Sequence, residues 1–234
     1  KALCDSKQIC LIEDNAHGIG ARYNGKPLGS LGNISATSFH ETKNVHCFSG
    51  GLLSLNNEHM IEQSIKYFNK GTDRHLFQKG SVDYYQWVSN GNSCEMSSLN
   101  KAFLYHQIQL LEDVNQQRFA IWNTYQKAFE GKEWNFIADR IRLDSKSKHN
   151  AHIYPICFKD ANQRLKIEQA LQAHGIAAYT HYHSLNLTKF GKQYGTFQTP
   201  NANYFSNGLL RLPIYPGLDL KSQEFIIKCL LEHI

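Results

Sequence analysis

Short apolar runs separated by polar and glycine-containing stretches mark the first part of the chain and predict buried strands. The run QICLIED, residues 8–14, ends in two acids, as expected of a buried parallel strand with a polar carboxyl end. NISATSF (33–39) and GLLSL (51–55) predict two further strands. Asn24-Gly25 lies between short extended pieces and is typical of a type I′ hairpin turn.

Apolar positions at helical spacing predict the helices. One helix is expected over residues 57–71, from an Asn cap to Gly71. The longest is expected from Ser97 to about Phe129. Its apolar stripe consists of Leu99, Ala102, Phe103, His106, Leu110 and Val114. Residues 72–95, aromatic and rich in Gly and Ser, are expected to form a loop.

The second half alternates between strand and helix patterns. Strands are predicted at 151–158 and 176–182, and helices at 162–175 and 220–234. Residues 130–135 and 142–150 have the polar composition of linkers. The pattern predicts an α/β domain over 1–129 and a smaller α+β domain over 130–234.

Composition narrows the class of protein. The chain has 234 residues, 41% hydrophobic and 19% charged, which favours a globular protein with a substantial core. The net charge of +5 is spread along the chain, so no nucleic-acid partner is expected, and the apolar runs are too short for a membrane span. With no signal peptide visible, we expect a cytoplasmic protein with reduced thiols that act as small buried hydrophobes. The six scattered cysteines are Cys4, Cys10, Cys47, Cys94, Cys157 and Cys229.

Two glycine patterns suggest nucleotide binding, and both are disfavoured. GIGARYNG has Tyr23 where a dinucleotide fingerprint needs its third glycine. GARYNGKP has Pro27 where a phosphate-binding loop needs Ser or Thr. That loop must also lead into a helix, whereas Asn24-Gly25 favours a hairpin. The turn interpretation is therefore preferred.

Histidine and cysteine chemistry is also disfavoured. His181 and His183 alternate on a predicted strand, but the sequence nearby offers too few further residues at the spacing that zinc ligands need. His149 and His152 are also close in sequence, but they too have too few further ligands nearby. Cys47 follows a histidine directly, and adjacent residues seldom form a nucleophile pair. No metal site is predicted.

Lys43 is the remaining candidate. It follows a predicted strand within SFHETKN, among small polar residues, which suits a lysine that forms a Schiff base. Asp14 ends another strand, and the carboxyl ends of adjacent parallel strands line one crevice. Ser38 could hydrogen-bond a phosphate. An acid, a hydroxyl and a lysine match the needs of pyridoxal phosphate. A solvated loop lysine and a capping aspartate remain the alternative.

These residues belong to longer segments that resemble the DegT/StrS-type family of sugar aminotransferases. The likeness begins with IEDNAHGIGARYNGKPLGSLGNISATSFHETKN and continues in order through most of the chain. The resemblance implies the aspartate-aminotransferase-like (PLP type I) fold, with a partial large domain built on a mainly parallel sheet and a small C-terminal α+β domain. It also implies a homodimer and the cofactor pyridoxal 5′-phosphate.

Site residues follow from the resemblance, position by position. Lys43 matches the Schiff-base lysine, and Asp14 the aspartate that pairs with the pyridine nitrogen. His17 matches the residue that lies against the cofactor ring, and Ser38 the serine that holds the phosphate. Ser93 falls where much of the family has an Asn that reaches the partner subunit's phosphate.

The implied reaction transfers the amino group of L-glutamate to C4 of a dTDP-4-keto-6-deoxyhexose. Two departures stand out: Phe48 and Ser49 replace a Gly and a Glu, and Lys101 stands where a small residue is usual. Relative to the family, the chain is expected to start partway through the large domain, so the family's N-terminal phosphate loop and ring-stacking aromatic are not expected within it. A truncated, non-catalytic remnant that acts as a binding or assembly module is therefore the alternative hypothesis.

Overall fold

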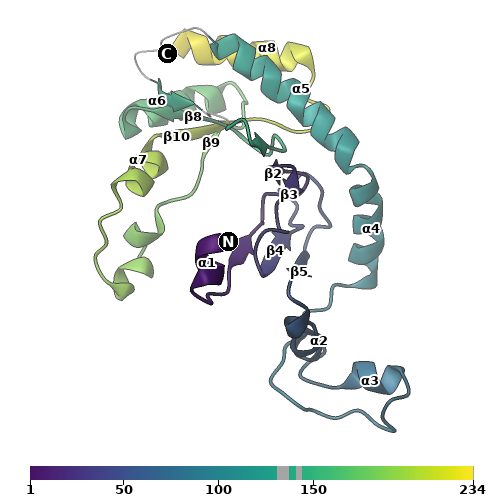
Figure 1. The fold of residues 1–234 in the computed structure, drawn as a ribbon. Coiled ribbons are helices and arrows are strands. Elements are labelled where there is room, and N and C mark those ends of the chain that lie inside the picture. The colour runs from purple at the N-terminus through teal and green to yellow at the C-terminus, as the bar shows by residue number, and fades with distance from the viewer. Residues whose placement is uncertain (131–136, 141–143, 234) are drawn as a thin grey trace. The chain divides into compact units, whose positions relative to one another are not determined.

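The computed structural model describes residues 1–130, 137–140 and 144–233 (Figure 1). The described chain divides into two compact units. Unit 1 contains Lys1–Val114 and Lys146–Asn150, and unit 2 contains Asn115–Ser145 and Ala151–Ile234. The expected boundary at 129/130 concerns the domains of the family's fold and stays a prediction.

Unit 1 is built on a three-stranded sheet in the order β1-β4-β5. The strands are β1 (Ile12–Asp14), β4 (Ile34–Ser38) and β5 (Gly51–Leu55). β1 and β4 are parallel, whereas β4 and β5 are antiparallel. The antiparallel pairing differs from the expected mainly parallel sheet. Residues 39–50 contain no helix, and a parallel return needs a longer crossover.

A second sheet of unit 1 contains the predicted hairpin. β2 (Arg22–Tyr23) and β3 (Lys26–Pro27) are antiparallel around Asn24 and Gly25, whose φ angles of 49° and 75° are positive. The turn interpretation of this segment is therefore confirmed. β7 (Ser147–Lys148) pairs with β2, so these two residues of the predicted linker form a strand instead.

The helices of unit 1 follow the sequence pattern in part. The described helices are α1 (Ala2–Ser6), η1 (Glu58–Met60), α2 (Ile61–Phe68), α3 (Arg74–Gln78) and α4 (Ser98–Gln109). The Asn57 side chain accepts a hydrogen bond from His59 N, as predicted for a cap. The loop prediction for 72–95 is wrong at α3, because one short turn of helix leaves no apolar period to detect.

The longest predicted helix consists of two. α4 ends at Gln109 and α5 (Leu111–Phe129) begins two residues later. The expected apolar stripe is largely exposed in α4, where Leu99 is 79% exposed and Leu104 is buried. Apolar residues occur on several faces of α4, so their spacing predicted a helix but not its buried face.

Unit 2 has a four-stranded antiparallel sheet in the order β6-β8-β10-β9. Its strands are β6 (Ile137–Arg140), β8 (Tyr154–Phe158), β9 (Tyr179–Thr180) and β10 (Leu209–Leu212). Its helices, besides α5, are α6 (Ala161–Ala173), η2 (Leu185–Leu187), η3 (Gly191–Tyr194), α7 (Pro200–Gly208) and α8 (Leu220–His233). The strand at 176–182 was predicted too long: β9 ends before His181 and His183.

The two units have cores of different size. In unit 2, apolar residues of α5, β8, β10, α6 and α8 form one large buried cluster. Tyr125 and Phe158 are fully buried in it. The cluster of unit 1 is smaller and consists of Phe39, Val45, Cys47 and Leu104.

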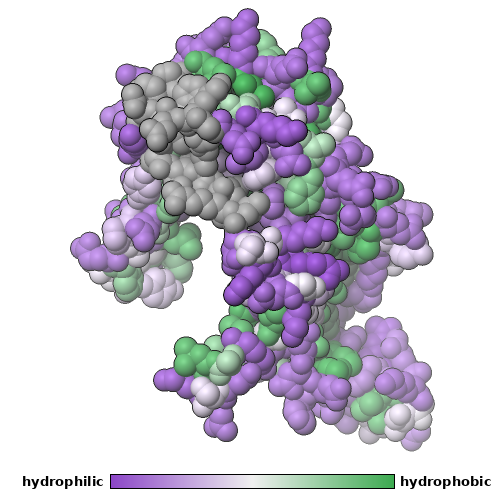
Figure 2. Space-filling view, turned by 45° about the horizontal axis from the view of Figure 1, so that its top comes forward, coloured by the Kyte–Doolittle hydropathy of each residue, from purple (hydrophilic) through white to green (hydrophobic). Residues whose placement is uncertain are grey.

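The surface fits the composition. Hydrophilic residues cover most of the face drawn in Figure 2, with hydrophobic residues in smaller groups between them. In the part of the chain that the structure describes, every helix is too short or too polar to cross a membrane. All six cysteines are free. Cys10 and Cys94 are exposed and Cys4 is partly exposed, so the prediction of buried thiols is wrong for these three.

Candidate functional site

Two predicted site residues end neighbouring parallel strands of unit 1. Asp14 is the last residue of β1 and Ser38 is the last residue of β4. In the parallel register, Asp14 lies opposite Ala36, so both carboxyl ends lie on one edge of the sheet. Ser38 Oγ accepts a hydrogen bond from His40 N at 3.3 Å, and Asp14 Oδ1 accepts one from Ala16 N at 3.1 Å. Local backbone bonds therefore hold both side chains where their loops begin.

Lys43 lies in the tight turn that follows β4. Its backbone N donates to His40 O at 3.0 Å, and Cys47 N donates to Phe39 O at 2.9 Å. Val45 and Cys47 are fully buried, whereas Lys43 is partly buried. The residues after Lys43 thus anchor the turn in the core of unit 1, and Lys43 itself lies at the edge of that core.

His17 lies in the loop after β1 and is partly buried. Its carbonyl oxygen accepts a hydrogen bond from Asn150 Nδ2 at 2.7 Å. Asn44, which follows Lys43, donates from Nδ2 to the Asn150 carbonyl oxygen at 2.8 Å. These contacts connect residues 133 and 106 positions apart, and the local sequence pattern gave no sign of them.

Glu13 is a second feature that sequence reasoning missed. Its carboxylate accepts hydrogen bonds from the backbone N–H groups of Gly29, Leu31 and Gly32 at 2.8, 2.6 and 2.5 Å. Burial raises the pKa of Glu13. The three N–H donors together lower it by more than burial raises it, so the pKa lies below its usual value. Glu13 thereby fixes the loop that leads into β4.

Ser93 lies apart from this sheet edge. It is exposed, forms an antiparallel bridge with Asn69, and its N–H donates to Asn92 Oδ1 at 2.8 Å. Asn69 follows α2, and Figure 1 shows the α2–α3 segment extending away from the three-stranded sheet. Four of the five predicted residues therefore belong to the loops and strand ends around β1 and β4, and Ser93 does not.

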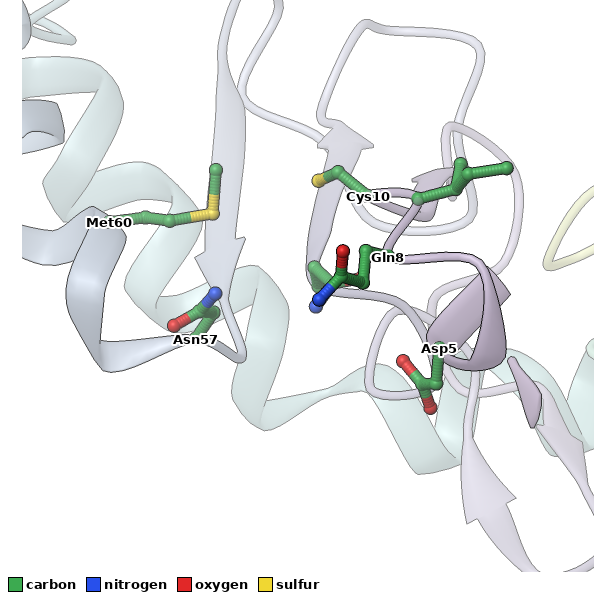
Figure 3. Close-up of a pocket in the computed structure, with 7 residues that line it drawn as sticks. Asp5, Gln8, Cys10, Asn57 and Met60 are labelled. Atoms are coloured by element: carbon green, nitrogen blue, oxygen red, sulfur yellow. The ribbon is translucent and has the colours of Figure 1, made fainter. Parts of the chain in front are cut away.

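The described cavities lie elsewhere in each unit. One of about 320 Å³ in unit 1 is lined by residues that include Asp5, Cys10 and Met60, which point into it from α1, the following loop and η1 (Figure 3). One of about 470 Å³ in unit 2 is lined by residues that include His181 and His183. Among the described residues, three or more His, Cys, Asp or Glu side chains nowhere gather as metal ligands.

The structure also explains why Cys47 and the adjacent His46 are a poor nucleophile pair. Cys47 is fully buried, and burial raises the pKa of its thiol. A raised pKa keeps the thiol protonated and unreactive at neutral pH. Its neighbours Phe39 and Leu104 show that it serves as a core residue.

The donor set at the sheet edge fits pyridoxal phosphate chemically. Lys43 offers an amine to an aldehyde, Asp14 a carboxylate to a pyridinium nitrogen, and Ser38 a hydroxyl to a phosphate. Asp14 is exposed and Ser38 and Lys43 are partly exposed, so all three can be reached from solvent. A ligand that bridges the ends of β1 and β4 could meet them together.

Comparison with known proteins gives curated relatives of greater length. An uncharacterised protein of Methanocaldococcus jannaschii is 30% identical over 221 residues, which cover 90% of this chain and 56% of the relative. The UDP-4-amino-4,6-dideoxy-N-acetyl-beta-L-altrosamine transaminase of Campylobacter jejuni is 28% identical over 231 residues, which cover 96% of this chain and 58% of the relative. The chain thus spans somewhat more than half the length of these relatives.

Solved structures show the fold. A Streptococcus pneumoniae protein described as a sugar aminotransferase, in its PMP form, matches with a TM-score of 0.85 and 25% identity over 96% of this chain and 59% of its own. Helicobacter pylori PseC, an aminotransferase involved in the biosynthesis of pseudoaminic acid, matches with a TM-score of 0.89 and 22% identity over 99% of this chain and 61% of its own. The predicted aspartate-aminotransferase-like fold is confirmed.

The family follows from the extent of the match. The model of the DegT/DnrJ/EryC1/StrS aminotransferase family matches residues 1–231, almost the whole chain. The S. pneumoniae protein has also been solved in a PLP form, so family and fold relatives agree on pyridoxal phosphate as the cofactor. This chain belongs to the DegT/DnrJ/EryC1/StrS aminotransferase family.

Proposed function

We propose that this chain carries the cofactor lysine and the small C-terminal domain of a PLP-dependent sugar-nucleotide aminotransferase. The observation that carries the proposal is the arrangement at the ends of β1 and β4. Asp14 and Ser38 end parallel neighbouring strands, and Lys43 lies in the turn after the second. The family match supports the same chemistry.

Each residue has one role in this proposal. Lys43 would hold the cofactor through its aldehyde, and its amine, once released, would move a proton at the substrate carbon. Asp14 keeps the ring nitrogen protonated, Ser38 binds the phosphate, and His17 lies against the ring. When bound, the cofactor supplies an electron sink for the electron pair left at the substrate carbon.

The proposed substrates are L-glutamate as the amino donor and a dTDP-4-keto-6-deoxyhexose as the acceptor. The product would then be dTDP-4-amino-4,6-dideoxygalactose, a precursor of enterobacterial common antigen. The segment-by-segment resemblance supports this choice. The C. jejuni relative supports it more coarsely, because its name also denotes a nucleotide-linked 4-amino-4,6-dideoxy sugar.

We further propose that the enzyme is a cytoplasmic homodimer in which Ser93 reaches the phosphate of the partner's cofactor. The exposed position of Ser93, away from the Lys43 turn, is consistent with a role toward another chain. The dimer would then complete each site.

The test is to add pyridoxal phosphate to the purified chain and to reduce it with borohydride. We expect a yellow complex and, after peptide mapping, label on Lys43 that Lys43→Ala abolishes. Lys26→Ala, in the hairpin, is the matched control and should keep the label. The disfavoured phosphate-binding loop predicts binding of Mg²⁺-ATP that Lys26→Ala abolishes, so nucleotide binding by the wild type and this control tests that alternative.

The competing hypothesis is a non-catalytic remnant of the family. It is favoured by Phe48, which replaces a family glycine and has a left-handed φ of 66° and a side chain 57% exposed. Label spread evenly over exposed lysines, or none at all, would support the remnant and contradict the proposed enzyme.

A further inference from the structure

Asn150 is a buried residue at the end of the segment that carries β7. Its side chain binds one loop at two points: Nδ2 donates to the carbonyl oxygens of His17 at 2.7 Å and of Ile19 at 2.9 Å. Asn150 is only 5% exposed, so these bonds form away from bulk water. A buried amide that satisfies two carbonyl groups fixes the loop that contains them.

The backbone of Asn150 holds the other loop. Its carbonyl oxygen accepts a hydrogen bond from Asn44 Nδ2 at 2.8 Å, and Asn44 is itself 6% exposed. Asn44 is the residue directly after Lys43. Two hydrogen bonds in series thus connect the Lys43 turn to the His17 loop through one residue.

Two of the three segments in this connection, segment 146–150 and the His17 loop, are also held by other contacts. Segment 146–150 is fixed by the pairing of β7 with β2 and by the bond from Asn24 N to Lys146 O at 2.8 Å. The His17 loop is held at its start by Asn15, whose Nδ2 donates to Leu28 O at 3.2 Å and to Thr37 Oγ1 at 3.0 Å. Because these segments are anchored by other contacts, the hydrogen bonds of Asn150 and Asn44 fix the position of the Lys43 turn relative to them.

We propose that Asn150 is a positioning residue that, together with Asn44, sets the Lys43 turn relative to the His17 loop for cofactor binding. The inference rests on the proposed function, in which Lys43 and His17 both contact the same bound pyridoxal phosphate. Asn150 itself touches neither substrate nor cofactor in this role.

The first test needs no cofactor. Hydrogen exchange is measured by mass spectrometry on Asn150→Asp, Asn44→Asp and the control Asn123→Asp. Asn123 is exposed on α5, so the control adds the same charge outside the relay and its anchors. Each aspartate in the relay removes an amide donor, so exchange should accelerate about tenfold in both 15–20 and 40–47. An Asn44→Asp effect confined to 40–47 would overturn the relay.

The second test separates positioning from stability. Pyridoxal phosphate and borohydride are applied below the unfolding temperature of every variant, and label on Lys43 is divided by label on Lys26. We expect this ratio to fall at least fivefold in both relay variants and to be unchanged in Asn123→Asp. An unchanged ratio in folded Asn150→Asp would overturn the positioning role. If the wild-type chain itself takes no label on Lys43, the proposed function fails first and the positioning role falls with it, whatever the exchange data show.

Discussion

Glu13 illustrates how one residue can organise a site without taking part in its chemistry. Three backbone donors from the loop before β4 converge on its carboxylate. Such bonds stabilise the ionised form, as the lowered pKa shows. Asp14 follows directly in β1, and the two adjacent acids have different roles. Glu13 binds the loop before β4, whereas Asp14 remains exposed at the sheet edge.

Replacing Glu13 by Gln should therefore destabilise the protein at neutral pH. The neutral amide has one acceptor oxygen and weaker bonds, so we expect a loss of about 1–3 kcal/mol in the free energy of unfolding. Urea denaturation of the wild type and the variant at pH 7 measures it. Glu41→Gln is the control, since Glu41 is exposed, and it should change stability by less than about 0.5 kcal/mol.

The same residue gives a pH dependence with a defined sign. Because the folded pKa of Glu13 lies below its usual value of 4.5, its contribution is complete above that value and is lost as the pH falls through the folded pKa. The stability difference between wild type and Glu13→Gln should therefore shrink below about pH 4. A difference that is constant from pH 7 to pH 3 would contradict this role of the carboxylate.

At the scale of elements, two glycines with similar backbone angles allow a matched comparison. Gly25 in the β2–β3 turn has φ 75°, and an added Cβ would meet open space. Gly29 has φ 91°, but a Cβ there would lie 2.8 Å from both Asn15 Nδ2 and Ser35 Oγ. The first substitution adds backbone strain alone, whereas the second adds strain and a buried clash.

We therefore expect Gly25→Ala to cost about 1 kcal/mol and Gly29→Ala about 3 kcal/mol or more in unfolding free energy. Urea denaturation of both variants measures the difference. Gly29→Ala should also accelerate hydrogen exchange in the loop that Glu13 binds. Equal costs for the two variants would show that the packing around Gly29 adjusts without penalty.

Elements were predictable where the signal is local. The Asn24-Gly25 turn, the strand at β4 and the Asn57 cap each depend on a few neighbouring residues, and the structure has all three. Elements that depend on distant partners were not predicted. β7 is a strand because β2 lies beside it, and Ser147 and Lys148 carry no apolar pattern of their own.

The candidate site divides in the same way. Lys43 and Asp14 could be singled out because unusual residue types stand at predicted strand ends. Asn150 could not, because its partners His17 and Asn44 lie more than 100 residues away in sequence. Glu13 was within reach, since it stands beside Asp14. Its three donors, however, belong to a loop whose path only the fold determines.

At the scale of the whole molecule, the two units differ in how much apolar surface they bury. Unit 2 joins α5, α6, α8 and its sheet in one cluster, whereas the cluster of unit 1 has few members among the described residues. Burial of apolar surface is the main source of stability, at roughly 25 cal/mol per Å². The larger cluster should therefore make unit 2 the more stable unit of this chain.

Unfolding should then occur in two steps, with unit 1 first. Phe39 in unit 1 and Phe158 in unit 2 are 2% and 0% exposed, so Phe→Ala at each removes a matched volume and should cost about 3–5 kcal/mol locally. Pulsed hydrogen exchange along a urea series reports each unit separately. Phe39→Ala should shift only the transition of unit 1, and Phe158→Ala only that of unit 2. If both variants shift one common transition equally, the two units unfold cooperatively, and the larger core of unit 2 does not give it a separate, later transition.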